Sequence, residues 1–180
     1  MRSLKDRLNP YELAKYARLR VVGFEEIAAL SPETVEHLLG AGRNDWSGGA
    51  CSMPLPDGSK LIILNPSHPP NRRRATLMEE VSHVFLGHKP SRLAIKNTDE
   101  KGSSRARDYD AKIEEQAYSV GAAALVPFGG LRELLREAKT SREIAAHYNV
   151  SNALAEFRLK TTGLWSAYIG EQSERQYSKG

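Results

Sequence analysis

One predicted helix carries the side chains best suited to chemistry. Glu79, Glu80 and His83 fall on it, and at ~100° per residue positions 79 and 83 lie about 40° apart on a helical wheel. Leu77 and Val81 fall on the opposite side, facing the expected core. Two carboxylates and an imidazole on one face can hold a divalent metal, and the i, i+4 spacing is that of a His-Glu-x-x-His zinc helix. An ordinary exposed helix face is the alternative.

A later helix, predicted from about residue 111 to 126, supplies a further acid. Glu114 and Glu115 lie in its first turn, where the helix dipole would also stabilise a solvated carboxylate. Helix phase alone does not decide which of the two faces the first helix. The segment is rich in glycine and alanine, and Pro127 ends it.

Both segments resemble the ImmA/IrrE family of metallopeptidases. Residues 76–88 read TLMEEVSHVFLGH and are similar to the family helix TLAHELGHLLLGH. Residues 114–127 read EEQAYSVGAAALVP and resemble the family helix E-x-x-A-N-x-F-A-x-x-L-L-M-P. The order of the elements also agrees, with an N-terminal helix and a small sheet before the two motifs. The resemblance covers roughly residues 10–127.

The resemblance implies His83 and Glu114 as metal ligands and Glu80 as the general base. Glu79 stands where the family has its first histidine ligand, and carboxylate oxygen is also a zinc ligand. The implied cofactor is Zn²⁺, with Mn²⁺ as the second candidate because oxygen ligands favour harder ions. Two carboxylates cancel both charges of a divalent ion, so water at this site should be harder to ionise.

By this resemblance the expected function is that of a metal-dependent endopeptidase of bacterial type. It would hydrolyse a regulatory protein, such as a repressor or an antitoxin, through metal-activated water, in regulation or stress response. Residues 89–110 would gate the substrate, and Tyr109 or Tyr118 would steady the oxyanion. The alternative that Glu79 favours is a catalytically impaired, peptidase-like module that binds protein partners.

Three other candidates have plainer interpretations. His88 lies about 140° around the wheel from His83 and is expected to end the helix. Cys51 is expected to be a small buried residue of a strand. The arginines at 72–74 are expected to be a solvated cluster at the positive end of the helix dipole, which hints at an acidic partner, either the glutamates or an external one.

The segment from 140 to 161 is similar to a helix-turn-helix. Its second helix carries Arg158 and Lys160 but begins with few side chains that contact bases or phosphates. A DNA-binding regulator using these residues is the third alternative, beside their packing as part of the fold.

Composition is that of one globular domain. The chain has 180 residues, of which 40% are hydrophobic and 27% charged, and this excludes collagen-like and wholly disordered chains. No apolar run is long enough to span a bilayer or, near Met1, to form a secretory signal. With the lone Cys51, a cytoplasmic protein without membrane contacts is expected. The net charge of +4 is mild, and the oligomeric state stays open.

The predicted fold is a mostly helical α+β domain over 1–170, followed by a flexible tail over 171–180. A small antiparallel sheet would pack on the metal helix, and a helical hairpin would close the domain. Asn71 is the expected cap of a metal helix running from about Arg72 to Gly87. Helices are also expected to begin near Pro10, Pro32, Ala111, Ser141 and Asn152, and strands are expected over 19–22, 49–54 and 60–64.

Overall fold

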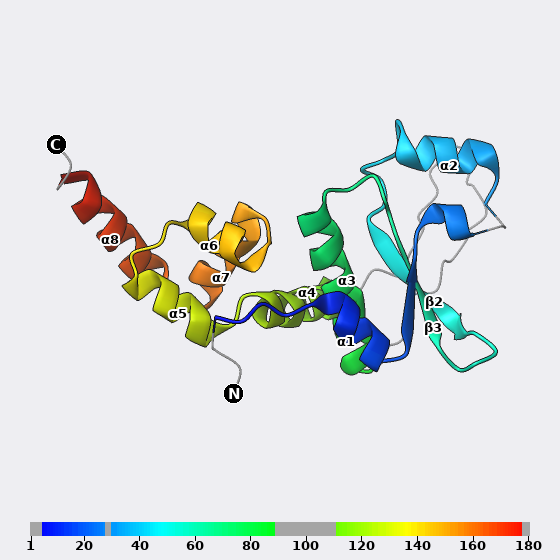
Figure 1. The fold of residues 1–180 in the computed structure, drawn as a ribbon, viewed down its shortest axis with the longest axis horizontal. Helices are drawn as coiled ribbons and strands as arrows, with labels where there is room; N and C mark the ends of the chain where they lie inside the picture. Colours follow the sequence, from blue (N-terminus) through cyan, green and yellow to red (C-terminus); the bar gives the residue numbers. More distant parts are fainter. Residues whose placement is uncertain (1–4, 28–29, 89–110, 178–180) are drawn as a thin grey trace.

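The computed structural model describes residues 5–27, 30–88 and 111–177. The molecule is elongated, with the sheet, α1, α2 and α3 at one end, α5 to α8 at the other, and α4 running between them (Figure 1). In chain order the elements are α1 (Pro10–Tyr16), β1 (Leu19–Val22), the 3-10 helix η1 (Phe24–Glu26), α2 (Pro32–Leu39), β2 (Gly48–Pro54), β3 (Lys60–Leu64), α3 (Pro70–Phe85), α4 (Ala111–Leu125), α5 (Phe128–Arg136), α6 (Ser141–Tyr148), α7 (Asn152–Thr161) and α8 (Trp165–Tyr177). The predicted α+β, mostly helical class is confirmed.

The sheet is mixed rather than antiparallel throughout. Its strand order is β1-β3-β2. β2 pairs with β3 antiparallel through a hairpin turn, in which Asp57 Oδ1 accepts a hydrogen bond from Ser59 N at 2.9 Å. β1 pairs with β3 in parallel, with Leu19 opposite Lys60. A tight hairpin turn requires its two strands to be antiparallel, so the direction of β2 relative to β3 follows from the sequence. The longer connection from β1 through α2 carries no such local signal. The prediction of an antiparallel sheet was therefore wrong for β1.

Helix α3 begins two residues before the predicted start. Pro69 is its N-cap and Pro70 its first residue, a position where proline loses no hydrogen bond. Asn71 therefore lies inside the first turn, where its Oδ1 accepts from Arg72 N at 2.9 Å instead of capping the helix. The buried side of α3 includes Leu77 and Val81, both fully inaccessible, as the periodicity predicts.

Helix α4 packs closely against α3. A Cβ added at Gly121 would lie 3.3 Å from Glu79 N and from the carbonyl of Met78, a tighter approach than most side chains allow. Ala117 and Ala122 are also buried on this helix. The small residues of α4 thus let the two backbones approach. This closeness brings the beginning of α4 to the polar face of α3.

The helical end contains two helices that were not predicted. Helix α5 follows Pro127 directly and buries three leucines at helical spacing, Leu131, Leu134 and Leu135. Helix α8 extends through Tyr177, so the segment expected as a tail is helical over its first residues. The predicted starts of α6 and α7 are confirmed, and Thr140 and Ser151 cap these helices, Thr140 through a capping box with Glu143.

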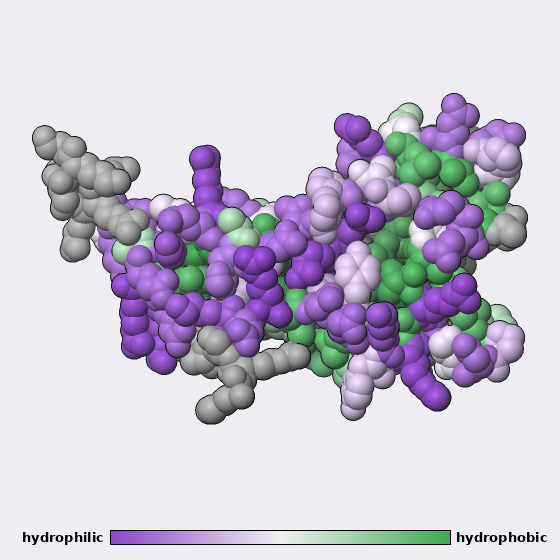
Figure 2. Space-filling model, in the orientation of Figure 1, coloured by the Kyte–Doolittle hydropathy of each residue, from purple (hydrophilic) through white to green (hydrophobic). Residues whose placement is uncertain are grey.

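Apolar side chains are visible mainly at the sheet end of the molecule, whereas the helical end presents a mostly polar surface (Figure 2). Cys51 is partly buried in β2 rather than fully enclosed. Among the helices within the described ranges, none combines the length and apolar character needed to cross a membrane.

Candidate metal centre

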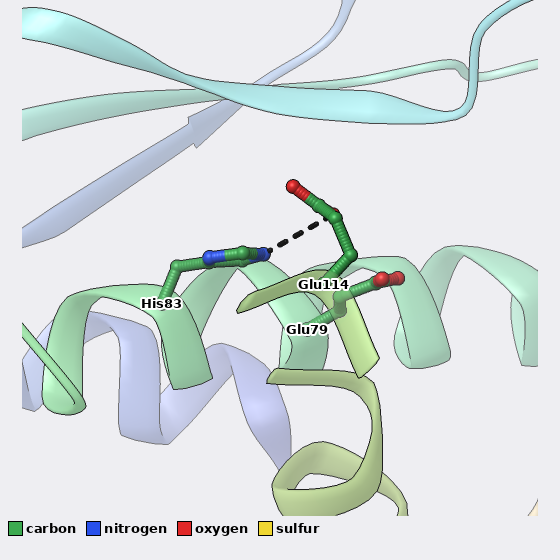
Figure 3. Close-up of side chains that lie close together, drawn as sticks. All are labelled: Glu79, His83 and Glu114. Carbon is green, nitrogen blue, oxygen red and sulfur yellow. Dashed lines mark ion pairs between the residues drawn. The ribbon is translucent and has the colours of Figure 1, made fainter. Parts of the chain in front are cut away.

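Three side chains from two helices converge on one point. Glu79 and His83 lie one turn apart on α3, and Glu114 reaches them from the first turn of α4 (Figure 3). One ligand atom from each lies within 4.8 Å of the other two. His83 Nε2 is 3.5 Å from Glu114 Oε2. Two carboxylates and an imidazole at this spacing form a donor set that fits a divalent cation.

The burial of these groups is intermediate. The His83 and Glu114 side chains are 17% and 22% exposed, so a small ion could enter while the charges remain partly desolvated. Glu115 is exposed on α4, so the structure brings Glu114 to the cluster and resolves the ambiguity that the sequence left. Glu80, the predicted base, follows Glu79 on α3 and is half-buried.

A tyrosine borders the cluster. Tyr118 lies one turn after Glu114 on α4, and its ring makes an edge contact with Phe157 of α7 at a centroid distance of 5.1 Å. Burial, and then the charge of Glu79, raise the pKa of the Tyr118 phenol. The phenol is therefore neutral near pH 7 and able to donate a hydrogen bond. Tyr109 and residues 89–110, the other predicted contributors, lie outside the described residues.

The arginines that precede the cluster hold neighbouring segments. Arg72 donates to Ser47 Oγ at 2.9 Å, and Arg74 donates to the carbonyl of Leu8 at 2.8 Å. Burial lowers the pKa of the Arg74 guanidinium. Arg72 thus binds the segment before β2, and Arg74 binds the N-terminal segment. Both side chains have a structural role that does not involve the glutamates of α3.

Residues 35–160 match a peptidase family model described as the IrrE N-terminal-like domain. The matched region is more than half of the chain and contains Glu79, His83 and Glu114. The chain belongs to this family. No curated protein matches the chain by sequence. The resemblance inferred from the two motifs is thereby confirmed, and with it a metallopeptidase-like family for this IrrE N-terminal-like domain.

His88 is a neighbour of the cluster that the helical wheel missed. The helix ends at Phe85, and Gly87 has a φ of +69°, so the chain turns and His88 N donates back to His83 O at 2.9 Å. The His88 ring then lies 5.0 Å from that of His83, with the two Nδ1 atoms 3.0 Å apart. The predicted angle of 140° assumed a helix continuing through position 88. A glycine one residue before a histidine was the available signal.

Helix α7, the second helix of the helix-turn-helix-like segment, packs against the rest of the domain. Arg158 is only 9% exposed and donates from Nε to the carbonyl of Val126 at 3.1 Å, at the end of α4. Burial lowers the pKa of this guanidinium. Lys160 lies over the Trp165 ring, 4.6 Å from its centroid. Both basic side chains of this helix have partners within the fold, which favours the structural interpretation of residues 140–161.

Proposed function

We propose that this IrrE N-terminal-like domain is a metal-dependent endopeptidase that hydrolyses a regulatory protein, with Glu79, His83 and Glu114 as the metal ligands. The observation that carries the proposal is the 4.8 Å cluster of one nitrogen and two carboxylate donors on two packed helices. Zn²⁺ suits this donor set, and the second carboxylate makes Mn²⁺ a competitor.

A divalent ion held there would polarise the scissile carbonyl and lower the pKa of the attacking water. Glu80 serves as the general base, which accepts the proton of the water and passes it to the leaving amine. Tyr118 donates a hydrogen bond to the developing oxyanion, a role that its neutral phenol supports. The substrate class, a repressor or an antitoxin, is proposed from the family resemblance.

Metal content tests the ligand set. The purified chain, loaded with Zn²⁺ or Mn²⁺ and dialysed, should retain metal when measured by inductively coupled plasma mass spectrometry. Glu114→Gln should lose most of it, because one anionic ligand becomes neutral, whereas Glu115→Gln is the matched control at the exposed neighbour and should retain it. A wild-type chain that retains no metal would contradict the proposal.

Activity tests the base. Glu80→Gln should retain the metal of the wild type but lose cleavage of a peptide library read by mass spectrometry, by about 10²–10⁴-fold, which is the usual contribution of a general base. The alternative, a binding module without catalysis, is favoured by one observation, the acid at position 79. The binding-module alternative predicts that the wild type shows no metal-dependent cleavage and that the wild type and Glu80→Gln bind a partner protein equally well.

A further inference from the structure

His88 and Gln116 form a chain of hydrogen bonds behind His83. His88 Nδ1 lies 3.0 Å from His83 Nδ1, and His88 Nε2 lies 3.2 Å from Gln116 Oε1. On the other side of its ring, His83 presents Nε2 toward Glu114. The three side chains therefore connect the exposed surface of α4 with the nitrogen that faces the candidate metal centre.

The acceptor at Gln116 determines which atom donates in each of these hydrogen bonds. Gln116 Oε1 can only accept, so His88 Nε2 carries a proton. A neutral His88 then has a lone pair on Nδ1 and accepts from His83 Nδ1–H. A neutral His83 protonated on Nδ1 has its lone pair on Nε2, the atom 3.5 Å from Glu114 Oε2. When no cation lies between these two atoms, the carboxylate favours a proton on Nε2, so Glu114 opposes the tautomer that His88 and Gln116 favour. We propose that His88 and Gln116 are positioning residues that fix His83 in the tautomer whose Nε2 can bind a cation, an inference that rests on the proposed metal centre.

The fold supplies this arrangement through a turn and a helix packing. The positive φ of Gly87 returns His88 to the end of α3. The close packing of α4 on α3 places Gln116, two residues after Glu114, within reach of the returned ring. Ligating histidines usually donate their second N–H to a carboxylate, a backbone carbonyl or water, and the loss of that partner typically lowers metal affinity 10–100-fold. Here the His88 imidazole takes the place of that acceptor.

Substitution of Gln116 can reverse the direction of the two hydrogen bonds that run through His88. The Gln116 side chain is exposed, so it can be replaced by a residue that only accepts or by one that only donates. Gln116→Glu keeps the acceptor and should preserve the Nδ1–H tautomer of His83. Gln116→Lys offers only donors, so His88 Nε2 must accept and His83 should shift toward the Nε2–H tautomer. The measurement is ¹⁵N histidine NMR of the metal-free full-length protein at about pH 8, above the ordinary histidine pKa, with both substitutions made in a Glu114→Ala background that removes the opposing carboxylate.

The two Gln116 variants, made with Glu114 intact, should also differ in metal affinity. Measured by competition with a chromophoric chelator for Zn²⁺, affinity should fall at least about 10-fold from Gln116→Glu to Gln116→Lys. Charge alone could also produce a difference, so both substitutions are repeated with His88→Ala. Because the chain of bonds passes through His88, most of the difference should vanish in that background, whereas a direct charge effect would persist.

Two results would overturn the positioning role: an Nε2–H tautomer of His83 in the Glu114→Ala protein, or an Nδ1–H tautomer there that Gln116→Lys leaves unchanged. The tautomer is read without metal and without substrate, so its outcome is separate from that of the proposed function. Zn²⁺ binding by the wild type together with a failed tautomer test disproves only the role of His88 and Gln116. A passed tautomer test together with a wild type that retains no metal disproves the proposed function.

Discussion

The side chain at position 79 sets the charge of the proposed metal centre. Glu79 and Glu114 together cancel a divalent ion, and His83 contributes no charge when neutral. Glu79→His would leave one net positive charge and replace an oxygen donor with nitrogen. We expect this variant to favour Zn²⁺ over Mn²⁺ by about tenfold more than the wild type, or about 1.4 kcal/mol. Competitive binding of the two ions measures this.

A histidine introduced next to the cluster, rather than in it, is the control for the change in Zn²⁺ over Mn²⁺ preference. It shows whether an added imidazole alone changes this preference. Glu115→His changes the same residue type at an exposed position and should leave the ratio of Zn²⁺ to Mn²⁺ affinity at the wild-type value. An unchanged ratio in Glu79→His would mean that position 79 does not bind the ion. Increased peptide cleavage by Glu79→His at neutral pH would agree with easier ionisation of water.

The sequence predicted which side chains lie together where only their spacing within one helix was needed. The i, i+4 relation of Glu79 and His83 needs only a helix, and the sequence supplied it. The choice of Glu114 over Glu115 needed the packing of α4 on α3, which helix phase alone does not give. His88 needed a turn at Gly87 that the helical wheel does not represent.

At the scale of elements, the packing of α3 against α4 positions the cluster. Helices with strong caps or apolar periodicity were predicted, and those that tertiary burial stabilises were not. Helix α5 begins with Phe128 and two glycines, which are weak helix formers, yet its leucines are buried in the helical end. The parallel partner of β3 likewise depends on a long connection whose path the sequence does not specify.

Gly121 tests the packing of α3 on α4. Gly121→Ala gains up to about 1 kcal/mol of helix propensity but places a Cβ 3.3 Å from backbone atoms of Met78 and Glu79, which cannot rotate away. Overpacking costs about 1–3 kcal/mol, so we expect a net loss of up to about 2 kcal/mol in the free energy of unfolding, together with weaker Zn²⁺ binding. Urea denaturation measures the first quantity and chelator competition the second.

Gly170 is the matched control for this substitution. It lies within α8, and a Cβ there would meet nothing within 4 Å. Gly170→Ala should therefore stabilise the protein by about 0.5–1 kcal/mol and leave Zn²⁺ affinity unchanged. Equal stabilisation by both substitutions would show that α3 moves to accommodate the methyl group without cost.

At the scale of the whole molecule, contacts of α7 with the middle and the end of α4 join the sheet end to the helical end. Phe157 packs on Tyr118 beside the cluster, and Arg158 binds the carbonyl of Val126 after the last turn of α4. The N-terminal segment adds a second connection, because Lys5 pairs with Glu137 while Arg74 holds Leu8. The family match from 35 to 160 spans both ends, consistent with α6 and α7 as integral parts of the domain.

Tyr148 makes the stability of the molecule sensitive to alkaline pH. Its side chain is 1% exposed in the helical end, and its hydroxyl finds no hydrogen-bond partner among the described residues. Burial, and then the charge of Glu133, raise the pKa of Tyr148 to about 12, above the ordinary value near 10. The fold thus favours the neutral phenol. This contribution to stability is fully present below about pH 10 and is lost as pH rises toward about 12.

Tyr148→Phe removes both the ionisation and the unpaired hydroxyl. We expect a neutral or slightly positive change in the free energy of unfolding at about pH 8, where both side chains are uncharged. Between about pH 8 and pH 11 the wild type should lose about 1.4 kcal/mol more than this variant, one pKa unit of differential ionisation. Urea denaturation at both pH values measures the difference, with Tyr16→Phe as the control because Tyr16 is 83% exposed. An equal alkaline loss in wild type and Tyr148→Phe would show that the Tyr148 phenol ionises in the folded protein as it does in water.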